Sequence, residues 1–255
     1  MSIQSVDRAL EILQLFSAAK TRLGISQMSK ALGIKNSTVH GLVRTLVKQG
    51  FLIQNSETRK YSLGVKNYEL SHFFLGGLKI YQVGSGTVHR LVQRTGRNSR
   101  LAIWDNDTVV VIMDIFAKPE NFHYYNIGPR IPAYCTSLGK AILASFSPKS
   151  ITAYFERNRL VPYTAHTITE QKSLVEDLEQ TTLRGYAIDR EEAIMGVFCM
   201  AAPIFDESKR PVAAISLSGS SDLLDSKKLS KAASDLILAS KEISYSMGFQ
   251  PKVPV

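Results

Sequence analysis

Apolar and polar positions in the first fifty residues repeat with the 3.6-residue period of an α-helix. The pattern predicts three helices, over residues 5–18, 26–32 and about 35–49. Ser26 is a suitable N-cap for the second helix, and Gly33 permits the left-handed conformation that ends it. Because only a tight turn separates the second and third helices, the pattern favours a helix-turn-helix.

Two short strands are predicted after the third helix. Residues 51–54 and 60–63 have the composition of strands, and they flank the polar turn 55–58. A hairpin directly after a helix-turn-helix is typical of a winged DNA-binding domain, so we assign residues 1–64 to such a domain. The same helix and strand pattern alone also fits a protein–protein module.

A connecting helix is predicted over residues 65–82, between the first domain and the rest of the chain. Its apolar positions, which include Val65, Tyr68 and the cluster 73–75, are unusually many for a linker. We interpret this stripe as an oligomer contact, or alternatively as a face that packs on its own domain. Gly84 and Gly86 are expected to interrupt the structure that follows.

The remaining residues, 83–250, mix strands and helices and indicate an α+β domain with an antiparallel sheet. Strands are predicted over residues 100–104, 109–115, 197–204 and 212–218. Helices are predicted over residues 137–144, 148–156, 170–184 and 226–247. The complete fold is therefore predicted to be α+β with two domains.

The net charge of +9 is concentrated at the N-terminus. Residues 1–66 hold ten Lys and Arg against three acids, a net charge of +7, so the rest of the chain carries +2. A concentrated positive field favours a polyanion such as nucleic acid or an acidic membrane surface. A solvated basic surface is the alternative.

The exposed side of the third helix suits the major groove of double-stranded DNA, which admits one helix. Arg44 pairs well with a guanine edge, and Gly41 lets the backbone approach closely. Arg59 and Lys60 in the hairpin are placed to hold a phosphate or to enter the minor groove. The predicted DNA-binding residues are Ser37, Thr38, His40, Arg44, Lys48, Arg59 and Lys60.

Other classes of function find little support in the sequence. Two cysteines, Cys135 and Cys199, are too few for a disulfide framework and fit a reducing cytoplasm. No stretch reaches the roughly 18 apolar residues of a membrane span, and no cofactor motif or metal-ligand spacing is present. The alternatives left open are a non-catalytic nucleic-acid-binding scaffold and an enzyme that uses Cys199. The histidines considered as metal ligands are His40, His72, His89, His123 and His166.

The segments SVDRALEILQLF, ISQMSKALGIKNSTVHGLVRTLVKQGFL and RKYSLG resemble the N-terminal domain of the IclR family of transcription regulators. The resemblance continues through IPAYCTSLGKAILAS, where Tyr134 replaces a histidine of many members. The C-terminal signature of the family is matched by Gly185, Asp189, Glu192, Cys199, Met200, Ala201, Ile204, Phe205 and Asp206. This resemblance implies palindromic operators bound by a dimer or tetramer, and a GAF- or PAS-like domain that holds a small anionic effector.

The residue types in the second domain fit such an effector. Backbone N–H groups at the start of the helix near Ser137 suit a carboxylate. Each candidate also has a structural alternative: Cys199 is a core thiol, Asp189 caps a turn, and the serines face solvent. The predicted effector-binding residues are Ile131, Ser137, Leu138, Asp189, Cys199, Ser216 and Ser218.

Overall fold

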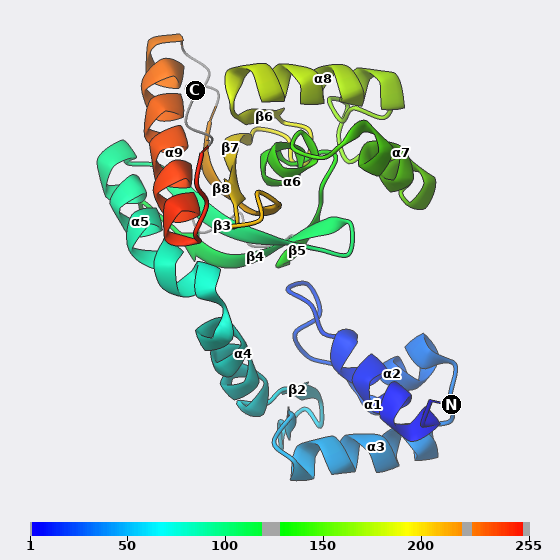
Figure 1. Cartoon of the computed structure of the whole chain (residues 1–255). Coiled ribbons are helices and arrows are strands. Elements are labelled where there is room, and N and C mark those ends of the chain that lie inside the picture. The colour runs from blue at the N-terminus through cyan, green and yellow to red at the C-terminus, as the bar shows by residue number, and fades with distance from the viewer. Residues whose placement is uncertain (1, 119–127, 221–225, 252–255) are drawn as a thin grey trace. The chain divides into compact units, whose positions relative to one another are not determined.

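The computed structural model describes residues 2–118, 128–220 and 226–251. The chain divides into two compact units, the first reaching Gly77 and the second beginning at Leu78. Figure 1 shows the helices and strands of both units. Each unit is described by itself below, and each has its own buried apolar core.

The first unit is a winged helix-turn-helix followed by one further helix. Its core is built by residues such as Ile12, Met28, Val39 and Val43, which come from three different helices and are almost fully buried. The elements are α1 Gln4–Gln14, α2 Ile25–Leu32, α3 Asn36–Lys48, β1 Leu52–Gln54, β2 Tyr61–Leu63 and α4 Lys66–Gly77.

The ends of α2 show which local signals the sequence carried. Gly33 has a φ of 67° and ends the helix in the left-handed conformation, as predicted. The prediction of Ser26 as the N-cap is wrong, because Ser26 lies inside α2. The cap is Gly24, whose N–H donates to Oε1 of Gln27 at 2.8 Å. The helical period of α3 places the apolar Val47 one turn after the buried Val43, but Val47 is 36% exposed.

The wing is more firmly tied to the helices than the hairpin pattern implied. β1 and β2 pair antiparallel, with Leu52 opposite Leu63. Leu23, which precedes α2, forms an antiparallel bridge with Tyr61 through backbone bonds of 2.8 and 2.9 Å. Backbone hydrogen bonds therefore join strand β2 of the wing to the segment that leads into α2.

The predicted single connecting helix is two helices in the structure. α4 ends at Gly77, and α5 spans Lys79–Thr95. The expectation that Gly84 and Gly86 interrupt the chain is wrong, because α5 passes through both glycines. A Cβ atom on Gly84 would lie 2.9 Å from Cδ2 of Leu101, so the glycine allows close packing of α5 on the sheet.

The second unit is built around an antiparallel sheet of six strands in the order β5-β4-β3-β8-β7-β6. The strands are β3 Asn98–Asp105, β4 Thr108–Ile115, β5 Arg130–Pro132, β6 Ala187–Arg190, β7 Phe198–Phe205 and β8 Pro211–Gly219. The helices after α5 are α6 Ser137–Leu143, α7 Pro148–Arg157, α8 Gln171–Arg184 and α9 Ser226–Ser246. Of the six strands, the sequence pattern missed β5 and β6.

Helices cover both faces of this sheet (Figure 1). On one face Leu101 of β3 packs near Gly84 of α5, which is also close to Ile243 of α9. On the other face Ala102 belongs to a buried cluster with Leu138 of α6. Because neighbouring strand residues point to opposite faces, each residue of β3 can be assigned to the α5–α9 face or to the α6 face.

Candidate functional sites

The exposed side of α3 carries the residues predicted to bind DNA. Ser37, Arg44 and Lys48 follow one another at helical spacing, and all are exposed. Thr38 and His40 are exposed beside them. This side of the helix is polar and positively charged, while Val39, Val43 and Leu46 on its other side are buried.

Gly41 lies in the middle of that exposed side. A Cβ atom built on Gly41 has no neighbour within 4 Å, so packing within the protein does not require a glycine there. The absence of a side chain leaves the backbone of α3 bare between Ser37 and Arg44. Such a position suits close approach to a groove floor or to a phosphate.

The tip of the wing holds two basic side chains on a fixed backbone. Oδ1 of Asn55 accepts the N–H of Thr58 at 2.7 Å, and the N–H of Arg59 donates to the carbonyl of Asn55 at 3.0 Å. Arg59 has a φ of 56°, which is uncommon for a non-glycine residue. The side chains of Arg59 and Lys60 are exposed, so the turn presents two cations to solvent.

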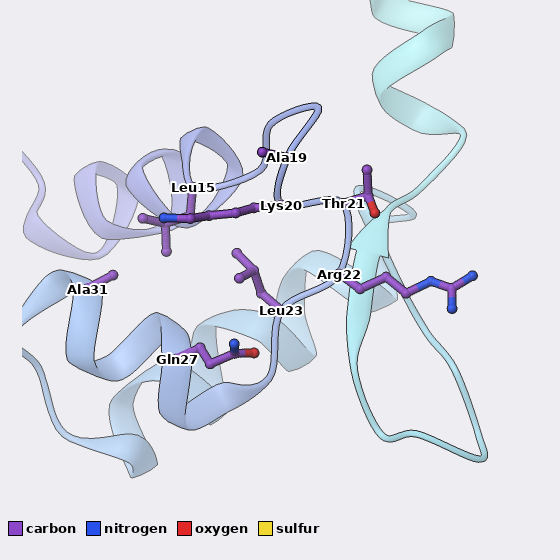
Figure 2. A pocket seen from close by; sticks show the side chains of 8 residues that line it. All are labelled: Leu15, Ala19, Lys20, Thr21, Arg22, Leu23, Gln27 and Ala31. Atoms are coloured by element: carbon purple, nitrogen blue, oxygen red, sulfur yellow. The ribbon is translucent and has the colours of Figure 1, made fainter. Parts of the chain in front are cut away.

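Two further cations lie near the helix-turn-helix and were not predicted as site residues. Lys20 and Arg22 are exposed on the segment between α1 and α2. Figure 2 shows them extending in opposite directions from this segment. Both side chains line a hollow of about 350 Å³. The residues that line the hollow are Leu15, Ala19, Lys20, Thr21, Arg22, Leu23, Gln27 and Ala31. Both cations contribute to the positive net charge of residues 1–66, but only the fold shows that they lie next to α2.

The register of the second sheet brings the predicted effector residues to one face. Asp189 of β6 lies opposite Cys199 of β7, and Cys199 lies opposite Ser218 of β8. Ser216 lies two residues before Ser218, so both serines point to the same side. This is the α6 face, because Ala201, the partner of Ser216, packs in one cluster with Leu138. Ile131 of β5 is a member of the same cluster.

Burial decides several of the alternatives. Ser216 is 2% exposed, so the alternative that its side chain faces solvent is wrong. Ser137 is also 2% exposed. Ser218 and Cys199 are half-buried. Asp189 does cap a turn, since its Oδ1 accepts the N–H of Glu192 at 2.8 Å. That bond occupies one of its two oxygens.

The start of α6 has the arrangement expected of a helix N-terminus. Oγ1 of Thr136 accepts the N–H of Gly139 at 3.3 Å, and the carbonyl of Thr136 accepts the N–H of Lys140 at 2.9 Å. Thr136 is therefore the N-cap of α6. The N–H groups of Ser137 and Leu138 precede these bonds, so they are the ones that a ligand could occupy.

Burial also shifts the acidity of the site. Burial, and then the neighbouring Glu192 carboxyl, raise the pKa of Asp189 to about 7. Asp189 thus carries a proton for part of the time near neutral pH and can then donate a hydrogen bond. Burial raises the pKa of the Cys199 thiol far above its usual range, and that of Cys135 to about 12. Both thiols are uncharged at neutral pH, which does not fit a nucleophile.

Lys140 of α6 is a buried cation that the sequence pattern did not indicate, because lysine is normally exposed. Lys140 is 1% exposed, and its Nζ lies 2.5 Å from Oε1 of Glu192 and 2.8 Å from Oδ2 of Asp177. Arg184 reaches the other oxygen of Asp177 at 3.7 Å. This network joins α6 and α8 to the turn after Asp189, so it holds the walls of the site together.

The described residues contain no group of three or more His, Cys, Asp or Glu that could hold a metal ion. His123, one of the histidines considered from the sequence, lies outside those residues. None of the described helices has the length and apolar character needed to cross a membrane. Cys135 and Cys199 are both free.

Two family models match the chain. Residues 5–56 match the IclR helix-turn-helix domain, and residues 72–245 match the bacterial transcriptional regulator IclR C-terminal domain. A winged helix-turn-helix joined to an α/β effector domain defines a DNA-binding transcriptional regulator. The chain belongs to the IclR family.

Individual relatives are similar to this chain along almost its whole length. The chain is 36% identical over 247 residues to the HTH-type transcriptional regulator XynR of Escherichia coli K12, covering 97% of this chain and 98% of that protein. It is 30% identical to the transcriptional repressor IclR of the same organism, covering 96% and 90%. A solved IclR homolog from Microbacterium hydrocarbonoxydans, complexed with 4-hydroxybenzoate, has the same fold: its TM-score is 0.82 at 21% identity, with 95% and 98% covered.

Proposed function

We propose that the protein binds palindromic operator DNA and places α3 in the major groove. The observation that carries this proposal is the exposed side of α3, where Ser37, Arg44 and Lys48 flank the bare backbone of Gly41. Arg44 reads a guanine edge, and Arg59 and Lys60 of the wing hold phosphates. Thr38 and His40 contact the same groove from the margin of the helix.

Salt titrations that compare Arg44→Ala with Lys60→Ala test these roles on a duplex that the wild type selects from a random pool. Arg44→Ala should cost about 1–3 kcal/mol and relax preference at one base step, because it removes a base contact. Lys60→Ala should weaken all duplexes alike and reduce the log–log salt slope by about 1, because it removes a phosphate contact. Fluorescence anisotropy measures both effects.

Substitution of Glu57, an exposed acid of the same turn, provides the control, and Glu57→Gln should not weaken binding. If Arg44→Ala retained full affinity and base preference, α3 would not be the reading helix. If single strands bound as tightly as duplex, the DNA-binding mode would be wrong.

We further propose that the protein acts as a homodimer or homotetramer. Three aromatic side chains of α4 are exposed in the part of the chain that the structure describes: Tyr68 is 69% exposed, Phe73 70% and Phe74 55%. Leu10 of α1 is 51% exposed as well. Exposed aromatic clusters of this kind mark interaction sites, and a two-fold axis matches a palindromic operator.

The expected result in solution is a stable oligomer at micromolar concentration. Light scattering should give at least twice the mass of one chain, and Phe73→Glu/Phe74→Glu should shift the protein toward monomer, because two charges would be desolvated in the contact. Lys79→Glu, an exposed charge at the start of α5, serves as the control. A wild-type monomer, with and without operator, would contradict the proposal.

The α6 face of the second unit is proposed to hold a small organic acid that changes operator affinity. The N–H groups of Ser137 and Leu138 take the carboxylate, Ser216 and Ser218 complete its hydrogen bonds, and protonated Asp189 donates one more. Cys199 and Ile131 form part of the wall. Support comes from the convergence of these residues on one face and from the 4-hydroxybenzoate bound by the solved homolog.

We assign DNA binding to residues 1–64, the connection to residues 65–82 and effector binding to residues 83–250. Repression is the mode of action we infer, in line with repressors among the relatives. A DNA partner and two free cysteines support a location in the cytoplasm. The uncharged Cys199 thiol and the regulators among the relatives support a non-catalytic protein.

A further inference from the structure

An ion pair lies on the α6 face beside the proposed effector residues. Arg100 of β3 lies opposite Ser216 of β8 on one side and opposite Asp114 of β4 on the other. Nε of Arg100 donates to Oδ2 of Asp114 at 2.9 Å. The two side chains are only 19% and 15% exposed, so the pair is largely shielded from solvent.

An irregularity in β4 puts Asp114 in this place. The pairing of β3 with β4 shifts by one residue between Leu101 and Ala102, so that Ala102 lies opposite Val111 and Leu101 opposite Met113. Strict alternation from Val111 would have put Met113 on the α6 face and Asp114 on the opposite face. The extra residue in β4 exchanges them, and an acid joins the polar face.

Among the described residues, the ion pair leaves one donor edge and one acceptor atom without partners. Oδ1 of Asp114 is buried and accepts no hydrogen bond from a residue that the structure describes. Within the described ranges, the two Nη atoms of Arg100 have no hydrogen-bond acceptor. The guanidinium also lies near the Cys199 thiol, where its charge opposes the rise of the thiol pKa. The free edge and the free oxygen thus belong to the same face as the effector residues.

A free donor and a free acceptor side by side select a particular chemical group. A hydroxyl accepts a hydrogen bond and donates one, so it satisfies both Arg100 and Asp114. A hydrocarbon would leave Oδ1 of Asp114 unsatisfied, and a second carboxylate would meet the negative charge of Asp114. We propose that Arg100 and Asp114 recognise a hydroxyl group of the effector, which is therefore a small hydroxy acid whose hydroxyl lies away from its carboxylate. This inference rests on the proposed effector function.

The test measures binding of two matched pairs of acids to the full chain by isothermal titration calorimetry. The pairs are 4-hydroxybenzoate with benzoate and gluconate with hexanoate. The wild type should bind the hydroxylated acid on the order of 10- to 100-fold more tightly in at least one pair, because a hydrogen bond to a charged group is gained. Arg100→Met/Asp114→Leu should bind both acids of that pair equally, and no more weakly than the wild type binds the acid without the hydroxyl.

The double variant removes both charges together, so no unpaired buried charge remains to destabilise the fold. Asp114→Asn is a second variant that keeps the size of the side chain, and it should reduce the preference for the hydroxylated acid. Arg130→Met is the control, since Arg130 forms an exposed ion pair with Asp105 and lies opposite Val110, not on the α6 face. Its preference should equal that of the wild type.

Equal binding of both acids in each pair by the wild type would overturn this inference alone. A preference that persists in the double variant and in Asp114→Asn would also overturn it, while the effector function would stand. If none of the four acids binds at millimolar concentration, both the proposed acid-effector function and this inference fail.

Discussion

Replacing Lys140 with methionine is expected to lower the free energy of unfolding by about 3–5 kcal/mol. Nζ of Lys140 is the partner of Glu192 at 2.5 Å and of Asp177 at 2.8 Å, and the Glu192 side chain is only 6% exposed. Methionine keeps the apolar stem but leaves a buried carboxylate without its cation. Urea unfolding followed by circular dichroism measures the loss.

Two variants separate the charge effect from a packing effect. Lys172→Met removes a lysine from an exposed pair with Glu176, where the side chains are 88% and 62% exposed, and should change stability by less than about 0.5 kcal/mol. Adding Glu192→Gln to Lys140→Met should restore part of the loss, because the unpaired charge is then gone. A loss below about 1 kcal/mol for Lys140→Met would show that the network does not stabilise the second unit.

The variant Ser216→Ala/Ser218→Ala is expected to bind operator normally and to lose its response to the effector. Each serine hydroxyl that is replaced removes one hydrogen bond to the charged ligand, which should cost about 1.5–3 kcal/mol of ligand affinity. The two sites belong to different units, so the effect of the acid on DNA is a coupling free energy, typically about 1–3 kcal/mol, and it is reciprocal. Operator titrations with and without the tightest-binding of the four acids named above measure it.

Ser234→Ala provides the matched control, because Ser234 is exposed on α9 and bonds only within its own helix in the described structure. Its response to the acid should equal that of the wild type. A double serine variant that still responds with unchanged ligand affinity would place the pocket elsewhere. Loss of operator binding without any acid would mean that the two serines affect folding, which the melting temperature would reveal.

The first unit could be predicted from the sequence to a large extent. Its signals are local: the helical period of α1 to α3, the left-handed Gly33 and the strand–turn–strand pattern of the wing. Local signals also gave the exposed residues of α3, because a helix presents a fixed set of positions to each side. The exposure of Val47 shows the limit of this reasoning, since the width of the buried stripe depends on what packs against it.

The sequence allowed candidate effector-binding residues of the second unit to be named, but it did not show which of them lie next to one another in space. Asp189, Cys199 and Ser218 come from three strands, and only the register places them in one row. β5 and β6 have three and four residues, too short to show a period of their own. The continuation of α5 through Gly84 depends on close packing against Leu101, a residue 17 positions away in the chain.

The sequence by itself determined the class of the protein, the two-domain α+β fold and most of the candidate residues, because periodicity, helix ends and charge are properties of neighbouring residues. The tertiary structure alone decided that Lys140 is buried between two carboxylates and that Asp114 joins Arg100 on the α6 face. Both outcomes depend on pairing between distant segments. A one-residue shift in β4 exchanges the side chains of the two faces, and no local pattern reports it.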